Sequence, residues 1–257
     1  MTSVRILADD LTGALDAAAP FATPAQPVHL VLDGALHADR QTISSESREL
    51  PLDAARASVR GALDKIRQGT DGRTLWFKKV DSVLRGWPAE ETLELMRCLD
   101  LPTCVFAPAF PEMGRRTVRG RHEVADLERP DVWSPATIHD LRKAFGAAGA
   151  QVAMLGEAGA QQGILIGNAS EPGDLRALVG RAPSRVLWAG SRGLAEALCF
   201  PPIPLAVPPI AIVVLGTSHP ATRKQAERLG QSRMANDVTV IDPVPTSASP
   251  SETIRHI

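Results

Sequence analysis

Short apolar runs recur along this chain, and each is followed by a segment with a helical pattern. The runs cover residues 4–8, 28–32, 42–44, 74–79, 103–107, 151–155, 163–167, 185–189, 211–215 and 238–241. The helical segments cover residues 13–21, 52–68, 88–100, 136–146, 171–180, 191–198 and 220–231. Runs unbroken by polar residues are typical of strands buried on both faces. The alternation therefore predicts an α/β fold with a parallel or mostly parallel sheet and helices on both faces.

A proline-rich stretch predicts a domain boundary. Residues 200–209 contain five prolines, which are compatible with neither a helix nor a central strand. We expect an N-terminal α/β domain over 1–200, a stiff connector over 201–210 and a second α/β domain beginning at 211–257. The last segment holds only a strand, a helix and another strand, so this second domain is expected to be incomplete.

Composition argues against several classes of protein. The net charge of −1, the absence of tyrosine and the 4% of aromatic residues argue against a nucleic-acid binder. Cys98, Cys104 and Cys199 lack CxxC spacing, which predicts free thiols in a reducing cytoplasm and neither a zinc site nor a disulfide framework. No secretory signal pattern and no apolar run of about 18 residues is found, so we expect a cytoplasmic protein without a membrane partner.

Two adjacent carboxylates, Asp9 and Asp10, follow the first apolar run and precede an alanine-rich helical segment. The carboxyl edge of an α/β sheet is where small ligands bind. Consecutive residues of a strand point to opposite sides. We therefore expect one carboxylate to face a pocket and the other to cap the helix or hold a loop. The alternative is that both only cap the helix.

A second constellation places cations beside a carboxylate. Lys79 and Asp81 share one face by the strand period of two, and Lys78 faces the other way. Either lysine is a candidate to hold a carboxylate or phosphate, and Arg85 and Gly86 follow at a turn suited to anion binding. The alternative is a charged strand end with an ordinary salt bridge. Arg48, in the polar loop after the third run, is a weaker candidate for an anion clamp.

Two further segments are candidate binding loops. Residues 107–120 contain two prolines and two glycines and begin at the end of the fifth run, so Arg115 is a candidate anion ligand. The alternative is a structural hairpin with solvated arginines. Thr217 and Ser218 stand between a strand pattern and a helix pattern, where free backbone amides bind phosphate. Hydroxyl residues also cap helices routinely, so this signal is weak.

Six ordered blocks resemble the four-carbon acid sugar kinase family. They are ADDLTGALD at 8–16, SRELP at 47–51, KKVDSVLRG at 78–86, APAFPEMGRRTVRG at 107–120, AGSRGLAEAL at 189–198 and LGTSHPATRKQ at 215–225. The resemblance implies phosphorylation of threonate or erythronate by ATP and Mg²⁺, with an N-terminal sugar-acid domain and a C-terminal nucleotide domain. Trp87 and Arg119 stand where family members usually carry Asn.

The resemblance also implies roles for individual residues. Asp9, Asp10 and Asp81 are expected to be catalytic, with Asp9 or Asp10 orienting the reacting hydroxyl. The substrate is expected to contact Arg48, Lys79, Ser82, Arg85, Gly86 and Arg115. Thr217 and Ser218 would lie on the nucleotide side, and no side-chain metal site is expected.

Three interpretations remain open from the sequence. The first is a sugar-acid kinase, whose competence in this short chain is open because no Gly-Gly step for ATP is present. The second is a non-catalytic relative that keeps the acid pocket but has no working ATP site. The third is a partner subunit of a longer homologue, and a homodimer is also expected because the second domain is unfinished.

Overall fold

The computed structural model describes residues 3–34, 36–199, 222, 224, 225, 227 and 228. The chain divides into two compact units, Met1–Pro204 and Leu205–Ile257. Nearly all described residues belong to the first unit, which carries the fold and the site discussed below. The predicted connector and the candidate nucleotide residues Thr217 and Ser218 lie outside the described residues, and the predicted domain boundaries stay a prediction.

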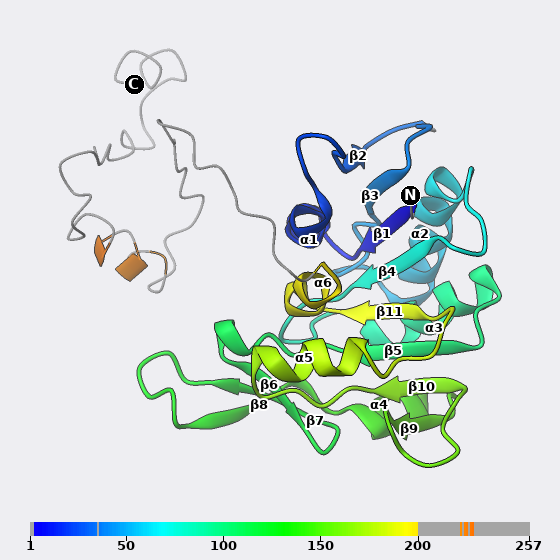
Figure 1. Ribbon diagram of the computed structural model, residues 1–257. Coiled ribbons are helices and arrows are strands. Elements are labelled where there is room, and N and C mark those ends of the chain that lie inside the picture. The colour runs from blue at the N-terminus through cyan, green and yellow to red at the C-terminus, as the bar shows by residue number, and fades with distance from the viewer. Residues whose placement is uncertain (1–2, 35, 200–221, 223, 226, 229–257) are drawn as a thin grey trace. The chain divides into compact units, whose positions relative to one another are not determined.

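The first unit is built on an eight-stranded sheet in the order β2-β3-β1-β4-β11-β5-β10-β9 (Figure 1). All of its strand pairs are parallel. The strands are β1 (Val4–Ala8), β2 (His29–Val31), β3 (Arg40–Ser44), β4 (Leu75–Lys79), β5 (Thr103–Ala107), β9 (Val152–Met154), β10 (Gly163–Ile166) and β11 (Leu187–Gly190). The predicted parallel sheet is confirmed.

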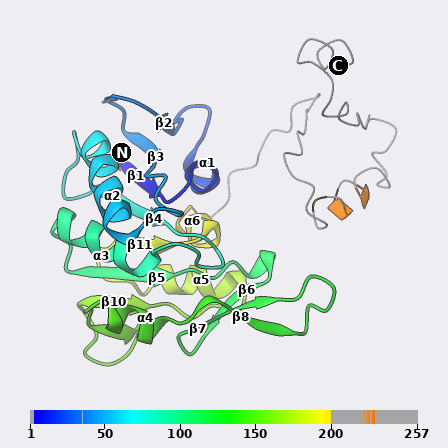
Figure 2. The same ribbon diagram turned by 180° about the vertical axis from the view of Figure 1, so that it is seen from behind.

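Helices cover both faces of this sheet, as predicted. They are α1 (Leu11–Ala18), α2 (Leu52–Ile66), α3 (Pro88–Leu99), α4 (Leu141–Ala147), α5 (Pro172–Val179) and α6 (Arg192–Leu198), with short 3-10 turns η1 (Ala19–Phe21) and η2 (Pro111–Met113). One buried cluster joins the sheet to α2, α3 and α4, and the other joins it to α1, α5 and α6. Figure 2 shows α2, α3 and α4 from their side of the sheet.

A second, three-stranded antiparallel sheet was not predicted. It consists of β6 (Arg115–Val118), β7 (Arg121–Ala125) and β8 (Trp133–Asp140) in the order β6-β7-β8. The predicted helix over 136–146 is therefore wrong in its first half, where the chain is the end of β8. Asp140 starts α4 instead, because its side chain accepts a hydrogen bond from the Lys143 amide.

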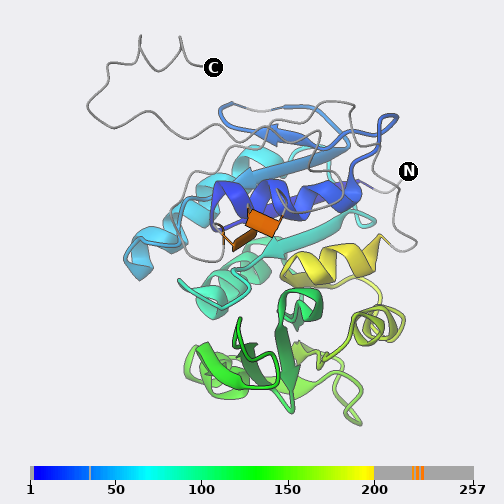
Figure 3. The ribbon, with the colours of Figure 1, turned by 90° about the vertical axis from the view of Figure 1, so that its left-hand side faces the viewer.

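The connections of the large sheet create a switch point between β1 and β4. From β1 the chain continues to β2 and β3 on one side, and from β4 it continues to β5 on the other. Ligands of open α/β sheets bind where such connections diverge, outside the carboxyl ends of the strands. These ends point to the left in Figure 1, and Figure 3 looks at that edge.

In the described part of the chain, no helix combines the length and apolar character that a membrane span requires.

Candidate functional site

An open pocket of about 580 Å³ lies at the switch point, where loops after β1, β4 and β11 meet. It is lined by Asp10, Thr12, Gly13, Asp16, Arg48, Lys79, Asp81, Ser82, Arg85, Phe110, Met113, Ser191, Arg192 and Glu196. Charged and hydroxyl side chains dominate this list. A small, highly polar ligand suits such a lining better than an apolar one.

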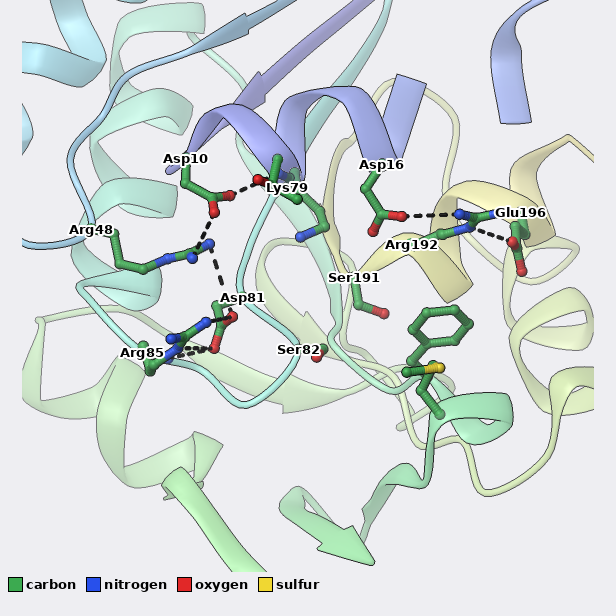
Figure 4. A pocket seen from close by; sticks show the side chains of 14 residues that line it. Asp10, Asp16, Arg48, Lys79, Asp81, Ser82, Arg85, Ser191, Arg192 and Glu196 are labelled. Atoms are coloured by element: carbon green, nitrogen blue, oxygen red, sulfur yellow. Dashed lines mark hydrogen bonds and ion pairs between the residues drawn. The ribbon is translucent and has the colours of Figure 1, made fainter. Parts of the chain in front are cut away.

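Arg48 organises one side of the pocket. Its Nε and Nη2 donate to the two carboxylate oxygens of Asp9 at 2.8 and 2.9 Å, and its Nη1 donates to Asp10 Oδ2 at 2.7 Å. A third carboxylate, Asp81, lies 3.9 Å from Nη2. We call Arg48, Asp9, Asp10, Asp81 and Arg85 the Arg48 cluster; Figure 4 shows all of these side chains except that of Asp9. The planar guanidinium of Arg48 donates to two carboxylates at once and leaves Nη2 within ion-pair distance of a third, which a lysine could not do.

Asp10 both caps α1 and lines the pocket. Its Oδ1 accepts a hydrogen bond from the Gly13 amide at 2.8 Å, so Asp10 is the N-cap of the helix. Asp9 is 4% exposed and is not among the lining residues. We expected one carboxylate to face the pocket and the other to cap the helix or hold a loop. In the structure Asp10 does both of the first two, and Asp9 holds the Arg48 loop.

Asp81 closes the turn after β4. Its Oδ2 accepts hydrogen bonds from the amides of Val83 and Arg85, each at 3.2 Å, and the Arg85 guanidinium donates to both of its oxygens. Burial alone would raise the pKa of this carboxyl, but the hydrogen bonds from Arg85 outweigh it and lower the pKa to about 2. Asp81 is therefore ionised at neutral pH and acts as an acceptor.

Lys79 lies between the two sides of the pocket with its ammonium group directed into it (Figure 4). The residue is 5% exposed, and among the described residues its Nζ has no hydrogen-bond or ion-pair partner. Burial lowers the pKa of Lys79, while Asp9, Asp16, Asp10 and Asp81 oppose that shift. A buried cation without a partner is costly, so its place in a pocket points to an anionic ligand.

Arg192 organises the opposite side. Its Nη1 donates to Asp16 on α1 at 3.0 Å and its Nε donates to Glu196 on α6 at 2.6 Å; these three residues form the Arg192 cluster. Ser191 caps α6 through the Gly193 amide and donates from its hydroxyl to the Ala109 carbonyl at 2.8 Å. Since α1 and α6 pack together, this cluster ties two segments that are far apart in the sequence on this side of the pocket.

Two glycines of the site stand where neighbouring groups lie too close for a side chain. A Cβ on Gly13 would lie 2.5 Å from Asp10 Oδ1 and 3.2 Å from Lys79 Nζ, so any side chain there would displace both groups. Gly86 has φ +76°, and a Cβ on it would lie 3.1 Å from the Arg48 carbonyl oxygen. Gly86 thus lets the turn after β4 pack against the loop that carries Arg48.

The structure brings six of the predicted residues into the pocket lining: Asp10, Arg48, Lys79, Asp81, Ser82 and Arg85. Asp9 and Gly86 support that lining from behind it. Arg115 is not in the lining; its guanidinium donates to the Met113 carbonyl, and its role as a substrate ligand stays a prediction.

Several lining residues were missed from the sequence. Asp16 and Thr12 share a face of α1 by the spacing of four, and both stand in the first block of the resemblance. Ser191 and Arg192 stand in its fifth block. Membership of these blocks was therefore the sequence signal for the four residues, although none of their residue types indicates a binding role by itself.

Comparison with known sequences shows related kinases. The family model described as "Sugar-binding N-terminal domain" matches residues 4–144. A D-threonate kinase of Salmonella typhimurium is 28% identical over 260 residues, covering 86% of this chain and 59% of that protein. A D-threonate kinase of Cupriavidus necator is 30% identical over 274 residues, covering 89% of this chain and 65% of that protein. The chain thus spans less than two thirds of these relatives.

Comparison with solved structures finds proteins of the same fold. A DUF1537 protein of Bordetella bronchiseptica, crystallised with bound citrate as a domain-swapped dimer, matches with a TM-score of 0.60 and 28% identity, covering 76% of this chain and 55% of that one. Together with the match over residues 4–144, these relatives confirm the resemblance that the sequence blocks indicated. The chain belongs to the four-carbon acid sugar kinase family, through its sugar-binding N-terminal domain.

Proposed function

We propose that the pocket at the β1/β4 switch point binds a four-carbon sugar acid of the threonate or erythronate type. The observation that carries this proposal is that Lys79 is buried except where it lines the pocket, and its ammonium group has no hydrogen-bond or ion-pair partner among the described residues. A carboxylate of the ligand would supply the missing partner through a charge-assisted hydrogen bond. The names of the D-threonate kinases and the citrate bound to the Bordetella relative support a hydroxy-acid ligand.

The Arg48 cluster would recognise the ligand's hydroxyl groups. Both oxygens of Asp10 already accept one hydrogen bond each, and each retains a further acceptor site. Asp10 is also the more open of the two adjacent carboxylates, with 27% of its side chain exposed against 5% for Asp9. We therefore assign the orientation of the reacting hydroxyl to Asp10, and assign to Asp9 the positioning of Arg48.

In the whole protein we propose a kinase that transfers the terminal phosphoryl group of ATP to one hydroxyl of the acid. Phosphoryl transfer depends mainly on positioning and on charge stabilisation, which the charged groups of the pocket would supply on the acid side. Thr217 and Ser218 remain the proposed nucleotide residues. Mg²⁺ is proposed to accompany ATP, because kinases hold this ion mainly through the phosphates together with one or two carboxylates.

A homodimer is part of the proposal. Its support is the domain-swapped dimer of the Bordetella relative, found in two crystal forms. Light scattering on the purified protein measures the mass directly, and twice the monomer mass is the expected result.

Isothermal titration tests the binding proposal. The protein is titrated with D-threonate, D-erythronate and the neutral polyol threitol, which keeps the carbon chain and hydroxyls but has no carboxylate. We expect micromolar to millimolar binding of at least one acid, about −4 to −8 kcal/mol, and no measurable binding of threitol. Absence of binding for every four-carbon acid, or equal binding of threitol, would contradict the proposal.

The variant Asp10→Asn refines the same titration. Asn keeps the helix cap but removes the charge that accepts from Arg48 and from a ligand hydroxyl, so we expect affinity for the acid to fall about tenfold. Incubation of the wild-type whole protein with D-threonate and Mg-ATP, followed by ³¹P NMR, separates two outcomes. A new phosphomonoester signal supports the kinase, and acid binding by the whole protein without one favours a non-catalytic relative.

A further inference from the structure

His122 is a fully buried histidine that bridges the antiparallel sheet and the pocket. It lies on β7 with 0% exposure. Its Nε2 is 2.9 Å from the Ser82 carbonyl oxygen, and its Nδ1 is 3.0 Å from the Thr117 hydroxyl on β6. Both ring nitrogens thus have partners, and one partner belongs to the turn that lines the pocket.

The partners define the hydrogen-bond directions. A carbonyl oxygen only accepts, so Nε2 carries a proton and donates to Ser82. Burial lowers the pKa of His122, which favours the neutral ring; Nδ1 then accepts from the Thr117 hydroxyl. Thr117 is itself fixed, because its backbone amide and carbonyl pair with Ala169 after β10. The bridge therefore rests on the large sheet at one end and on the pocket turn at the other.

The turn that His122 holds carries much of the site. Ser82 lies in the sequence between Asp81 and Arg85. Asp81 accepts hydrogen bonds from two backbone amides of the turn, and the Arg85 side chain forms an ion pair with Asp81. Leu84 in the same turn has φ +63°, a conformation unfavourable for a residue with a branched side chain. A turn of this kind keeps its shape only when the surrounding structure holds it. A second anchor comes from the same sheet, since the Thr137 amide on β8 donates to the Val83 carbonyl at 3.1 Å.

We propose that His122 is a positioning residue for ligand binding: its hydrogen bond to the Ser82 carbonyl holds the Asp81–Arg85 turn in the conformation that the pocket requires. The antiparallel sheet thereby acts as the support of the pocket turn. The inference rests on the proposed function for its ligand, but the turn itself is a property of the free protein.

Two measurements test it on the full chain. Amide hydrogen exchange reports the turn directly through residues 81–87, without any ligand. Titration with D-threonate reports the consequence for binding. The variants are His122→Leu, which removes both hydrogen bonds, and His122→Gln, whose side-chain amide retains a donor near the Nε2 position. The matched control is His139→Leu on β8, a half-buried histidine of the same sheet whose nearest charged partner is Glu123 at 4.0 Å.

We expect His122→Leu to speed exchange in residues 81–87 and to weaken D-threonate binding, each by about tenfold. His122→Gln should recover most of both losses, and His139→Leu should change neither. A purely structural role predicts a different result, in which all three variants change binding only as far as they lower the melting temperature. Should His122→Leu fail to fold, Thr117→Val is used, because it removes only the hydroxyl that orients the ring.

The outcomes separate this inference from the proposed function. Unchanged exchange and unchanged affinity in a folded His122→Leu protein would overturn the positioning role while leaving sugar-acid binding intact. Failure of the wild-type protein to bind any four-carbon acid would overturn the proposed function. In that case the exchange of residues 81–87 still decides whether His122 holds the turn.

Discussion

Lys78 and Lys79 are neighbours on β4, but they lie on opposite faces of the sheet in different surroundings. Lys78 is 0% exposed, and its Nζ lies 2.7 Å from Oε2 of Glu91 on α3, which is also buried. Lys79 is buried on the side of α1, where four aspartates oppose the lowering of its pKa by burial, but none of the described residues forms a hydrogen bond or ion pair with its ammonium group. The strand alternation places one ammonium in a closed ion pair and the other in a pocket.

This difference separates what the fold needs from what the site needs. A buried pair costs desolvation of both charges, and its loss is severe mainly because one partner is left alone. A buried charge that faces a pocket is instead paired by the group of a bound ligand. The two lysines therefore predict opposite phenotypes: Lys78 variants should change stability, and Lys79 variants should change binding.

The largest expected effect is that of Lys78→Met. It leaves Glu91 buried without its cation, and we expect a loss of about 3–5 kcal/mol in the free energy of unfolding. Urea denaturation measures it. The double variant Lys78→Met/Glu91→Leu should recover most of the loss, because both buried charges are then gone. A free energy of unfolding of Lys78→Met within about 1 kcal/mol of the wild-type value would contradict the structural role of Lys78.

A smaller effect is expected on the pocket side, at Asp81. Its folded-state pKa is about 2, below the ordinary value of 3.8, so the stability it contributes is present above pH 3.8 and is lost as the pH falls toward 2. Asp81→Asn lacks this titration. Denaturation at pH 5 and again near pH 3 should therefore show wild type and variant converging at the lower pH. A constant difference between them would mean that Arg85 does not hold the carboxylate as the structure shows.

The smallest effect is expected at the turn between β6 and β7, away from both lysines, where a substitution should change stability but not binding. Arg119 and Gly120 form the two-residue turn between β6 and β7, and both have positive φ, +52° and +74°. This is the geometry for which Asn-Gly is favoured. Arg119→Asn should raise stability by about 0.5 kcal/mol, measured by thermal denaturation, and leave D-threonate affinity unchanged. A loss of stability would mean that the Arg119 side chain makes a contribution that its exposed position does not suggest.

The parallel sheet was predictable because its strands are buried on both faces. For β1 and β5 the predicted ranges agree with the observed bounds, since all five residues of each strand are buried. The antiparallel sheet was not predictable in the same way. Its strands β6 and β7 contain Arg115, Arg116 and Arg121 and are mostly only partly buried, so no apolar run marks them.

The site was predictable where it follows strand ends and hidden where it depends on packing between distant elements. Asp10, Lys79 and Asp81 come directly after or at the ends of β1 and β4, and their meeting follows from the parallel order. The pair of Asp16 and Arg192 joins residues 176 positions apart, and only the packing of α1 against α6 brings them together. His122 could be noticed only as a histidine near a candidate loop.

The most direct test of the central claim is the affinity of Lys79→Met for D-threonate, measured by isothermal titration beside the wild type and Lys78→Met. Removing an unpaired buried ammonium should leave stability within about 1 kcal/mol of the wild type. It should also weaken binding at least about tenfold, because the ligand carboxylate loses its charge-assisted partner. Folded Lys78→Met should bind as the wild type does. Wild-type affinity in Lys79→Met would contradict the assignment of this pocket to a sugar acid held by Lys79.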